Sequence, residues 1–370
     1  MTSEALDLFL ELAAVSSPSG EERAVADRIT AELRALGLEV DEDDAGAEIG
    51  SNAGNLYTRL EPTAEGTPLF LCSHMDTVPP TGPIEPVVED GVVRNAGGTI
   101  LGADNKSAVV AMVETARRVV ERRIPHAGLE LLFTPKEEVG LRGAQAFDCS
   151  RFAARVGYVY DQAGPIGEVI LGAPHSMIME ITFVGQSAHA GMAPEEGRSA
   201  IAAAGRAIAD MRLGRLDDET SANVGVIHGG VARNIVPDRC VLNCEARSHD
   251  ETKLADVVQE MIDACSFAAS LVGCEVEADV TRGFHGYRFA RTDEPVRLAE
   301  AALRRTGHEP TYALSGGGAD ANVFNTRGLA CLNLANGMAE IHTPQEHIAV
   351  ADLDAMVDVT LALLEEARAA

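Results

Sequence analysis

Lysine is scarce in this chain of 370 residues, where it occurs only at Lys106, Lys136 and Lys253. Arginine therefore supplies nearly all of the positive charge, and 57 acidic residues against 30 basic ones give a formal net charge of -27. A protein this acidic repels phosphate backbones and anionic lipid surfaces, so we expect neither a nucleic acid nor a membrane as its partner. The scarcity of lysine says nothing more about function, because genome composition or adaptation to salt would produce the same bias.

Long apolar segments and paired cysteines are also lacking. No apolar run reaches the roughly 18 residues that a membrane-spanning helix needs, and the start of the chain lacks the basic-then-apolar order of a secretory signal. The seven cysteines show no zinc-knuckle spacing, and the one close pair, Cys240 and Cys244, falls in a strand-like stretch. We therefore expect reduced, buried cysteines and a cytoplasmic protein.

The length exceeds what one hydrophobic core usually supports, so we expect two domains. Short continuous apolar runs at 69–72, 129–133 and 156–160 predict strands covered on both faces. A helical apolar stripe begins just after Asp104, between the first two of these runs. This alternation predicts an α/β fold, with helices in layers on a mostly parallel sheet.

The pattern changes near Met177, where apolar residues alternate with less apolar ones as in a strand with one buried face. A helix over 195–213, two strands, a second helix and a final strand follow, which is the β-α-β-β-α-β order of a ferredoxin-like sandwich. We therefore expect a discontinuous catalytic domain, 1–175 and 286–370, interrupted by an inserted α+β domain, 176–285.

Metal-type ligands stand in five places, each just past an expected strand or at the start of a helix. Open α/β sheets place their ligands at the carboxyl ends of strands, so these side chains should meet at one edge of the sheet. Carboxylates and imidazoles gathered in this way suit a two-metal hydrolase. The five places are His74 with Asp76, Asp104, Glu137 with Glu138, Asp161, and His342.

Each residue type suits a particular task in such a centre. His74 suits a terminal ligand, Asp76 can accept the N–H of its second ring nitrogen, and Asp104 suits a bridge. Of the adjacent Glu137 and Glu138, one can bind metal while the other moves protons. Each also has an ordinary explanation, such as a helix N-cap for Asp104 or a solvated surface pair for the two glutamates. Those explanations would have to place every polar group at the same end of one sheet by accident.

The chain resembles the dinuclear zinc metallopeptidases that include peptidase T, carboxypeptidase G and the aminoacylases, and it is most similar to peptidase T-like members. The resemblance runs essentially from end to end and rests on motifs that are highly specific as a set. They are Ser-His-Met-Asp-Thr-Val-Pro at 73–79, Leu-Gly-Ala-Asp-Asn-Lys-Ser at 101–107, Pro-Lys-Glu-Glu-Val-Gly at 135–140, Gly-Gln-Ser-Ala-His-Ala-Gly at 185–191 and His-Thr-Pro-Gln-Glu-His at 342–347.

The resemblance implies a ligand set. His74 and Asp161 would hold one metal, Glu138 and His342 the other, and Asp104 would bridge them. It also implies a cis peptide bond between Asp104 and Asn105. The metals would be two zinc ions, although an oxygen-rich set would also accept cobalt or manganese.

The resemblance also assigns the remaining roles in the catalytic domain. Glu137 matches the general base and Asp76 the residue that orients His74. Glu137 would take a proton from a water between the metals and return it to the leaving nitrogen.

Four further residues are substrate-side candidates. His189 matches a family histidine that stabilises the oxyanion and commonly reaches across a homodimer formed through the inserted domain, although a structural loop histidine is the alternative. Arg247 could clamp a substrate carboxylate or be simply solvated, and Asn234 is a comparable polar candidate. Gly317 lies in a glycine-rich loop without the Gly-Lys-Ser/Thr ending of a P-loop, so the loop is better suited to close backbone approach by a peptide.

The leading hypothesis is therefore a two-metal hydrolase that cleaves amide bonds of short peptides, most like a tripeptide aminopeptidase. An N-acyl-amino-acid amidohydrolase or a carboxypeptidase of the same family is the alternative, since it would share the chemistry and differ in the substrate end that is held. A protein that lost catalysis and binds a partner on the same fold is a more remote alternative, because all five ligand positions are retained.

Overall fold

The computed structural model describes residues 4–369, which divide into two units. Unit 1 combines Met1–Gly172, Arg288–Ser315 and Ala319–Ala370, and unit 2 combines Ala173–Tyr287 with Gly316–Gly318. Across the described part of the chain, no helix is both long enough and apolar enough to cross a lipid bilayer.

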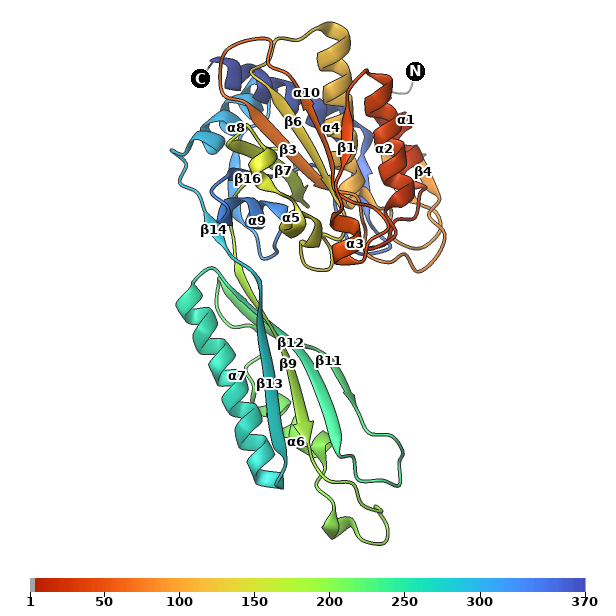
Figure 1. Cartoon of the computed structure of the whole chain (residues 1–370), viewed down its shortest axis with the longest axis vertical. Helices are drawn as coiled ribbons and strands as arrows, with labels where there is room; N and C mark the ends of the chain where they lie inside the picture. The colour runs from red at the N-terminus through yellow and green to blue at the C-terminus, as the bar shows by residue number, and fades with distance from the viewer. Residues whose placement is uncertain (1–3, 370) are drawn as a thin grey trace. The chain divides into compact units, whose positions relative to one another are not determined.

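A nine-stranded sheet runs through unit 1 (Figure 1). Its central strand β3 (Leu69–His74) pairs in parallel with β6 (Leu129–Thr134) on one side and β7 (Val156–Gln162) on the other, and β16 (Ala330–Ala335) continues the parallel order beyond β7. Every residue of β3 and β6 is buried, as continuous apolar runs predict for strands covered on both faces. The remaining strands of this sheet are β1 (Val40–Glu42), β2 (Leu56–Leu60), β8 (Glu168–Ala173), β14 (Tyr287–Arg288) and β15 (Thr311–Leu314).

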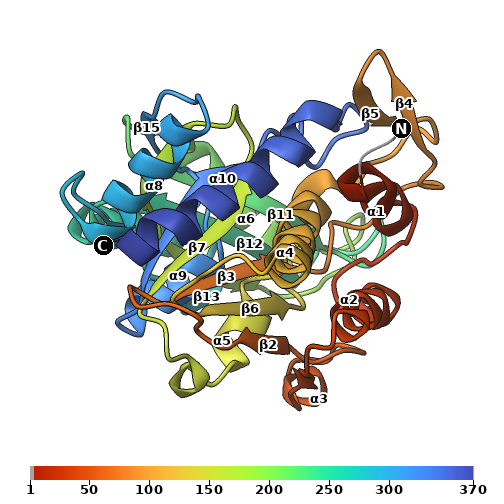
Figure 2. The ribbon, with the colours of Figure 1, turned by 90° about the horizontal axis from the view of Figure 1, so that it is seen from above.

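Helices cover both faces of this sheet, so the α/β prediction with a largely parallel sheet is confirmed (Figure 2). Helix α4 (Ala103–Arg122), which packs on β3 and β7, buries the apolar stripe that the sequence indicated. Helix α2 is followed by Gly37 with φ of 80°, the left-handed position that favours glycine after a helix. Helices α1 (Glu4–Ala13), α2 (Arg23–Ala35), α8 (Glu294–Arg305) and α10 (Val350–Ala369) lie on the α4 side, and α5 (Arg142–Ala146) and α9 (Asp320–Thr326) lie on the other face.

Two smaller features complete unit 1. A three-stranded antiparallel sheet forms from β4 (Pro86–Glu89), β5 (Val92–Asn95) and β17 (His347–Ala349), and the short helix α3 (Ala45–Ile49) packs against α5. The β5–β17 pairing links the segment before α4 to the chain that follows His342.

Unit 2 is a five-stranded antiparallel sheet with two helices on one face. Along β9 (His175–Val184), Met179, Ile181 and Phe183 are buried against the helices, whereas Ile178 and Glu180 are exposed, as the alternation predicted. The other strands, in sheet order around β9, are β10 (Gly214–Arg215), β11 (Thr220–Gly229), β12 (Arg239–Ser248) and β13 (Glu275–Phe284), and the helices are α6 (Ala200–Asp210) and α7 (Glu251–Val272).

The first helix of unit 2 is shorter than the prediction of 195–213. Ser199 caps α6 by accepting a hydrogen bond from the N–H of Ala202, and a 3-10 turn at Pro194–Glu196 precedes it. At the other end Met211 is extended. The predicted bounds were therefore wrong: on the C-terminal side Met211 and Leu213 continue the apolar pattern and pack on the core, although they lie outside the helix.

Candidate metal centre

Three neighbouring parallel strands deliver the predicted ligands to one edge of the unit 1 sheet. His74 is the last residue of β3, Glu137 and Glu138 follow the end of β6, and Asp161 lies near the end of β7. Asp104 stands at the start of α4, at a kink where its own backbone and that of Asn105 are not helical. The peptide bond between Asp104 and Asn105 is cis, as the family resemblance implied.

Asp104 faces two imidazoles with its two carboxylate oxygens. Its Oδ1 lies 3.2 Å from Nε2 of His74, and its Oδ2 lies 3.2 Å from Nε2 of His342. The carboxylate is almost fully buried, at 5% exposure. A carboxylate held in this way can bind a separate cation with each oxygen, which is the arrangement that a binuclear centre requires.

One further carboxylate stands beside each imidazole. Asp161 Oδ1 lies 3.6 Å from Nε2 of His74, and Glu138 Oε1 lies 3.0 Å from Nε2 of His342. The ligand atoms within each group of three, Asp104 being common to both, lie within 4.8 Å of one another. Imidazole nitrogens and carboxylate oxygens at this spacing fit divalent cations such as zinc.

The charges of the centre also fit bound cations. Burial, followed by the charge of Asp104, raises the pKa of Asp161 to about 7. Burial and the charge of Asp161 raise the pKa of Glu137 well above its usual range. Hydrogen bonds to Asp104 and Glu138 raise the pKa of His342 to about 10. Negative charge is thus in excess among these groups, and divalent cations would neutralise it.

Asp76 supports this centre mainly through the loop that carries the two glutamates. Its side chain is fully buried, with Oδ1 accepting from the N–H of Glu137 at 2.9 Å and Oδ2 from that of Glu138 at 3.3 Å. The Oγ of Ser19 donates to the same Oδ2 at 2.5 Å. His74 Nδ1 lies 2.9 Å from the main-chain oxygen of Asp76 but 3.5 Å from its carboxylate, so the nearer acceptor is the carbonyl rather than the expected side chain.

Two buried acids beside the centre were not assigned a role from the sequence. Glu346 accepts the N–H groups of Leu101, Gly102 and Asp104 at 2.7, 2.9 and 2.9 Å. Asp320 accepts a hydrogen bond from Thr134 Oγ1 at 2.6 Å, and burial raises its pKa to about 6. The only signal for Glu346 was its place in the motif that begins with His342.

The substrate-side candidates all belong to unit 2, where they form two local groups. His189 is exposed, its Nδ1 accepts from the N–H groups of Gly191 and Met192, and the carbonyl of Asn234 accepts the N–H of the next residue, Ala190. Elsewhere in the unit, Arg247 Nη1 donates to the carbonyl of Gly316, the residue before Gly317, at 3.2 Å. The guanidinium carbon of Arg247 also stands 5.5 Å from the centre of the Phe284 ring.

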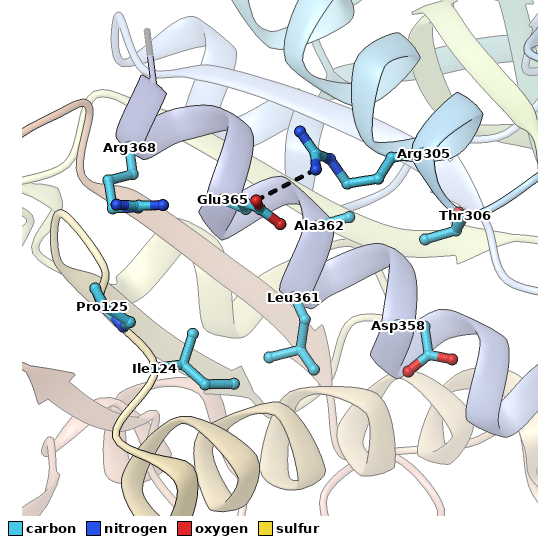
Figure 3. A pocket seen from close by; sticks show the side chains of 9 residues that line it. All are labelled: Ile124, Pro125, Arg305, Thr306, Asp358, Leu361, Ala362, Glu365 and Arg368. Carbon is cyan, nitrogen blue, oxygen red and sulfur yellow. Dashed lines mark hydrogen bonds and ion pairs between the residues drawn. The ribbon is translucent and has the colours of Figure 1, made fainter.

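Two pockets in unit 1 hold none of these residues. One of about 410 Å³ is lined by Ile124, Leu361 and Ala362 among others, with an Arg305–Glu365 ion pair of 3.2 Å at its wall (Figure 3). The other, of about 700 Å³, also includes Ile124, together with the end of β2. Ile124 precedes β6, so both pockets lie at the amino end of that strand, away from the edge that carries the ligands.

Comparison with known proteins places the chain in a family. The model of peptidase family M20/M25/M40 matches residues 70–366. The chain is 40% identical to the aminopeptidase PepT from Bacillus cereus, with a TM-score of 0.87 and 98% of both chains covered. It is 35% identical to a tripeptidase from Staphylococcus aureus, with a TM-score of 0.92, covering 99% of this chain and 98% of that one. Peptidase T from Pectobacterium atrosepticum is 26% identical over 278 residues, 74% of this chain and 67% of that protein.

Proposed function

The chain belongs to peptidase family M20/M25/M40 and is a metallopeptidase that hydrolyses peptide bonds, and we propose that it is an aminopeptidase releasing the first residue of tripeptides and other short peptides. The observation that carries the proposal is the placement of Asp104 between His74 and His342, with one carboxylate oxygen toward each. Preference for short free peptides is supported by the similarity, over nearly the whole chain, to the PepT aminopeptidase and to the tripeptidase.

In the proposed centre, His74 and Asp161 would hold one cation, Glu138 and His342 would hold the other, and Asp104 would serve both. We take the metals to be zinc, because two imidazoles with carboxylates suit it, although cobalt or manganese would also be accepted. Two cations held there would lower the pKa of a bound water and polarise the amide carbonyl.

Glu137 is the proposed general base. Its side chain is buried beside the ligands, and the hydrogen bond from its N–H to Asp76 Oδ1 fixes the backbone from which it extends. Its carboxylate takes the proton of the attacking water and later gives it to the leaving nitrogen. Burial and the neighbouring acid Asp161 raise its pKa, which favours a carboxylate able to accept a proton and return it.

Which end of the peptide is recognised can be tested with one tripeptide in three forms: free, N-acetylated and C-amidated. We expect the free peptide to be cleaved, and kcat/KM for the acetylated form to fall by at least about a hundredfold, because a site that pairs with the amine rejects a blocked one. Equal cleavage of the acetylated form would rule out the aminopeptidase proposal. Loss of cleavage on amidation alone would instead indicate a carboxypeptidase or an N-acyl-amino-acid amidohydrolase.

Unit 2 is proposed to act as a lid and as the surface through which two copies associate. Beyond its two-residue pairing with β10, the edge strand β11 exposes Val226 and Ile227, at 53% and 51%. Exposed apolar residues on an unpaired edge are typical of surfaces that meet a partner. Analytical ultracentrifugation tests this: we expect a dimer, and a shift toward monomer when Val226 and Ile227 are both replaced by lysine.

We also propose that His189 stabilises the developing oxyanion, that Arg247, Asn234 and Gly317 contact the peptide, and that the enzyme works in the cytoplasm. All seven cysteines are free, which fits a reducing compartment.

His189→Ala should lower kcat with little change in KM, whereas Arg247→Ala should mainly raise KM.

A further inference from the structure

Three side chains of unit 2 that take no part in the proposed reaction converge at one end of its sheet. His175 begins β9, His285 follows the last residue of β13, and Glu251 begins α7. Antiparallel pairing explains the convergence: Ser176 of β9 faces Phe284 of β13, so His175 and His285 emerge beside each other. Helix α7 starts just after β12, whose final residue faces His175, so Glu251 arrives at the same end.

The side chains are close enough to one another to form a metal site. One ligand atom from each of His175, Glu251 and His285 lies within 4.8 Å of the other two, the same limit that holds for each half of the Asp104 centre. The two imidazole rings have centroids 6.0 Å apart and planes at 78°. Ligands that share a tetrahedral zinc ion lie roughly 3.3 Å apart, so modest side-chain rotations would close the group around a cation.

His175 offers a lone pair suited to a metal. Its Nδ1 is buried and has no hydrogen-bond partner in the structure, an unusual state for a buried polar atom. Burial lowers the pKa of His175, and the neighbouring Arg282, His285 and His249 lower it further, against the opposing charge of Glu251. The imidazole is therefore neutral near pH 7, the form in which histidine binds metals.

Glu251 already has a partner, and this has to be weighed against a metal site. Arg282 Nη2 lies 2.7 Å from Glu251 Oε1, and both side chains are partly or largely exposed. This ion pair uses one carboxylate oxygen and leaves Oε2 as a possible ligand. Carboxylates that bind zinc are commonly hydrogen-bonded by a second group, so the arginine can orient Glu251 as well as compete for it.

We propose that His175, Glu251 and His285 bind one divalent transition-metal ion, zinc by their chemistry, at a site formed by unit 2 alone. Two imidazoles and one carboxylate leave a fourth tetrahedral position, which water can fill. The chain enters unit 2 at Ala173 and leaves the main part of it at Tyr287, so the two histidines lie two residues inside these points. A bound ion would therefore tie the first strand of the unit to the last, as a structural clip.

The test is the metal content of the full chain after equilibration with zinc and removal of loosely bound ions by dialysis. We expect three zinc ions per wild-type chain and two in the double variant His175→Ala/His285→Ala, with kcat on a tripeptide unchanged. His228→Ala, which removes an exposed histidine from β11 of the same unit, is the matched control and should keep three. Glu251→Gln provides a milder second variant, which should weaken zinc binding at this site at least tenfold.

The experiment can distinguish failure of the unit 2 metal site from failure of the proposed catalytic centre. If Asp104→Ala removes both catalytic metals, that variant should retain the one ion held by His175, Glu251 and His285. When cobalt replaces zinc in this variant, the protein should show the visible absorption of a tetrahedral nitrogen and oxygen site. A wild-type chain that holds two ions, both lost in Asp104→Ala, would overturn this proposal while leaving the catalytic centre intact. Three ions in the folded double variant would also overturn it. One ion in the wild type, lost in the double variant, would uphold this site and contradict the catalytic pair.

Discussion

Glu346 holds Asp104 from the backbone side. Its Oε1 accepts the N–H of Asp104 at 2.9 Å, while Oε2 accepts the N–H groups of Leu101 and Gly102 at 2.7 and 2.9 Å. Glu346 is 2% exposed and follows His342 by four residues. One side chain thus ties the loop that carries Asp104 to the segment that carries His342.

Replacing Glu346 should therefore damage both stability and metal binding. In Glu346→Ala three buried N–H groups lose a charged acceptor, and we expect the free energy of unfolding to fall by about 3 kcal/mol or more. Glu346→Gln retains one acceptor oxygen but turns an amide N–H toward the donors, so its loss should be intermediate. Thermal unfolding with zinc analysis provides the measurement. A Glu346→Ala protein with wild-type melting temperature and two catalytic metals would refute this role.

Removal of a shared ligand should have a different effect from removal of a terminal one. Because Asp104 belongs to both ligand groups and Asp161 to one, Asp104→Ala should lose both catalytic metals, whereas Asp161→Ala should keep the ion held by Glu138 and His342. Metal analysis of purified variants gives the count. Asp218→Ala, which removes an exposed carboxylate, is the control. If Asp104→Ala and Asp161→Ala lose the same number of ions, Asp104 does not bridge.

The sequence was most informative where ligands follow strands. Apolar runs located β3, β6 and β7, and parallel order then required that His74, Asp161 and the glutamate pair meet at one edge. The sequence could not predict that one carboxylate oxygen of Asp104 faces His74 and the other faces His342. That arrangement depends on the direction in which the Asp104 side chain points from the start of α4. Family resemblance, rather than spacing, implied that Asp104 bridges two metals.

Other features depend on tertiary neighbours that no local pattern reveals. Glu346 meets the Leu101–Asp104 loop across 242 or more positions of the chain, and nothing in either segment indicates the pairing. The cluster of His175, Glu251 and His285 likewise draws one residue from each of three elements, with no ligand spacing in the sequence. Antiparallel register brings the two histidines together, and the start of α7 directly after β12 adds Glu251.

Glu137 should be essential for turnover but not for metal binding. Glu137→Gln preserves the size of the side chain and the backbone hydrogen bond to Asp76, but the amide cannot take a proton from water. We expect kcat to fall by about three orders of magnitude while both catalytic metals remain. Single-turnover assays together with zinc analysis measure the two effects separately. Near-normal turnover in this variant would remove Glu137 from the reaction.

His126, just before β6, should make unit 1 sensitive to acid. The residue is buried, its Nδ1 accepts the N–H of Gly128 at 3.3 Å, and burial lowers its pKa from the ordinary 6.5. Well above pH 6.5 the imidazole is neutral in the folded and unfolded chain alike, so it does not make stability depend on pH. Below pH 6.5 the unfolded chain takes up a proton that the folded chain resists, and stability falls until the pH reaches the lowered value.

His126→Asn keeps an acceptor for Gly128 but cannot be protonated in this range. Between pH 7.5 and 5.5 its melting temperature should therefore fall less than that of the wild type. His228→Asn, which changes an exposed histidine, should fall as much as the wild type. Metal ligands are identical in all three proteins, so acid release of metal affects them equally and the difference isolates His126. If His126→Asn loses as much stability as the wild type over this interval, the buried imidazole is not a source of acid sensitivity.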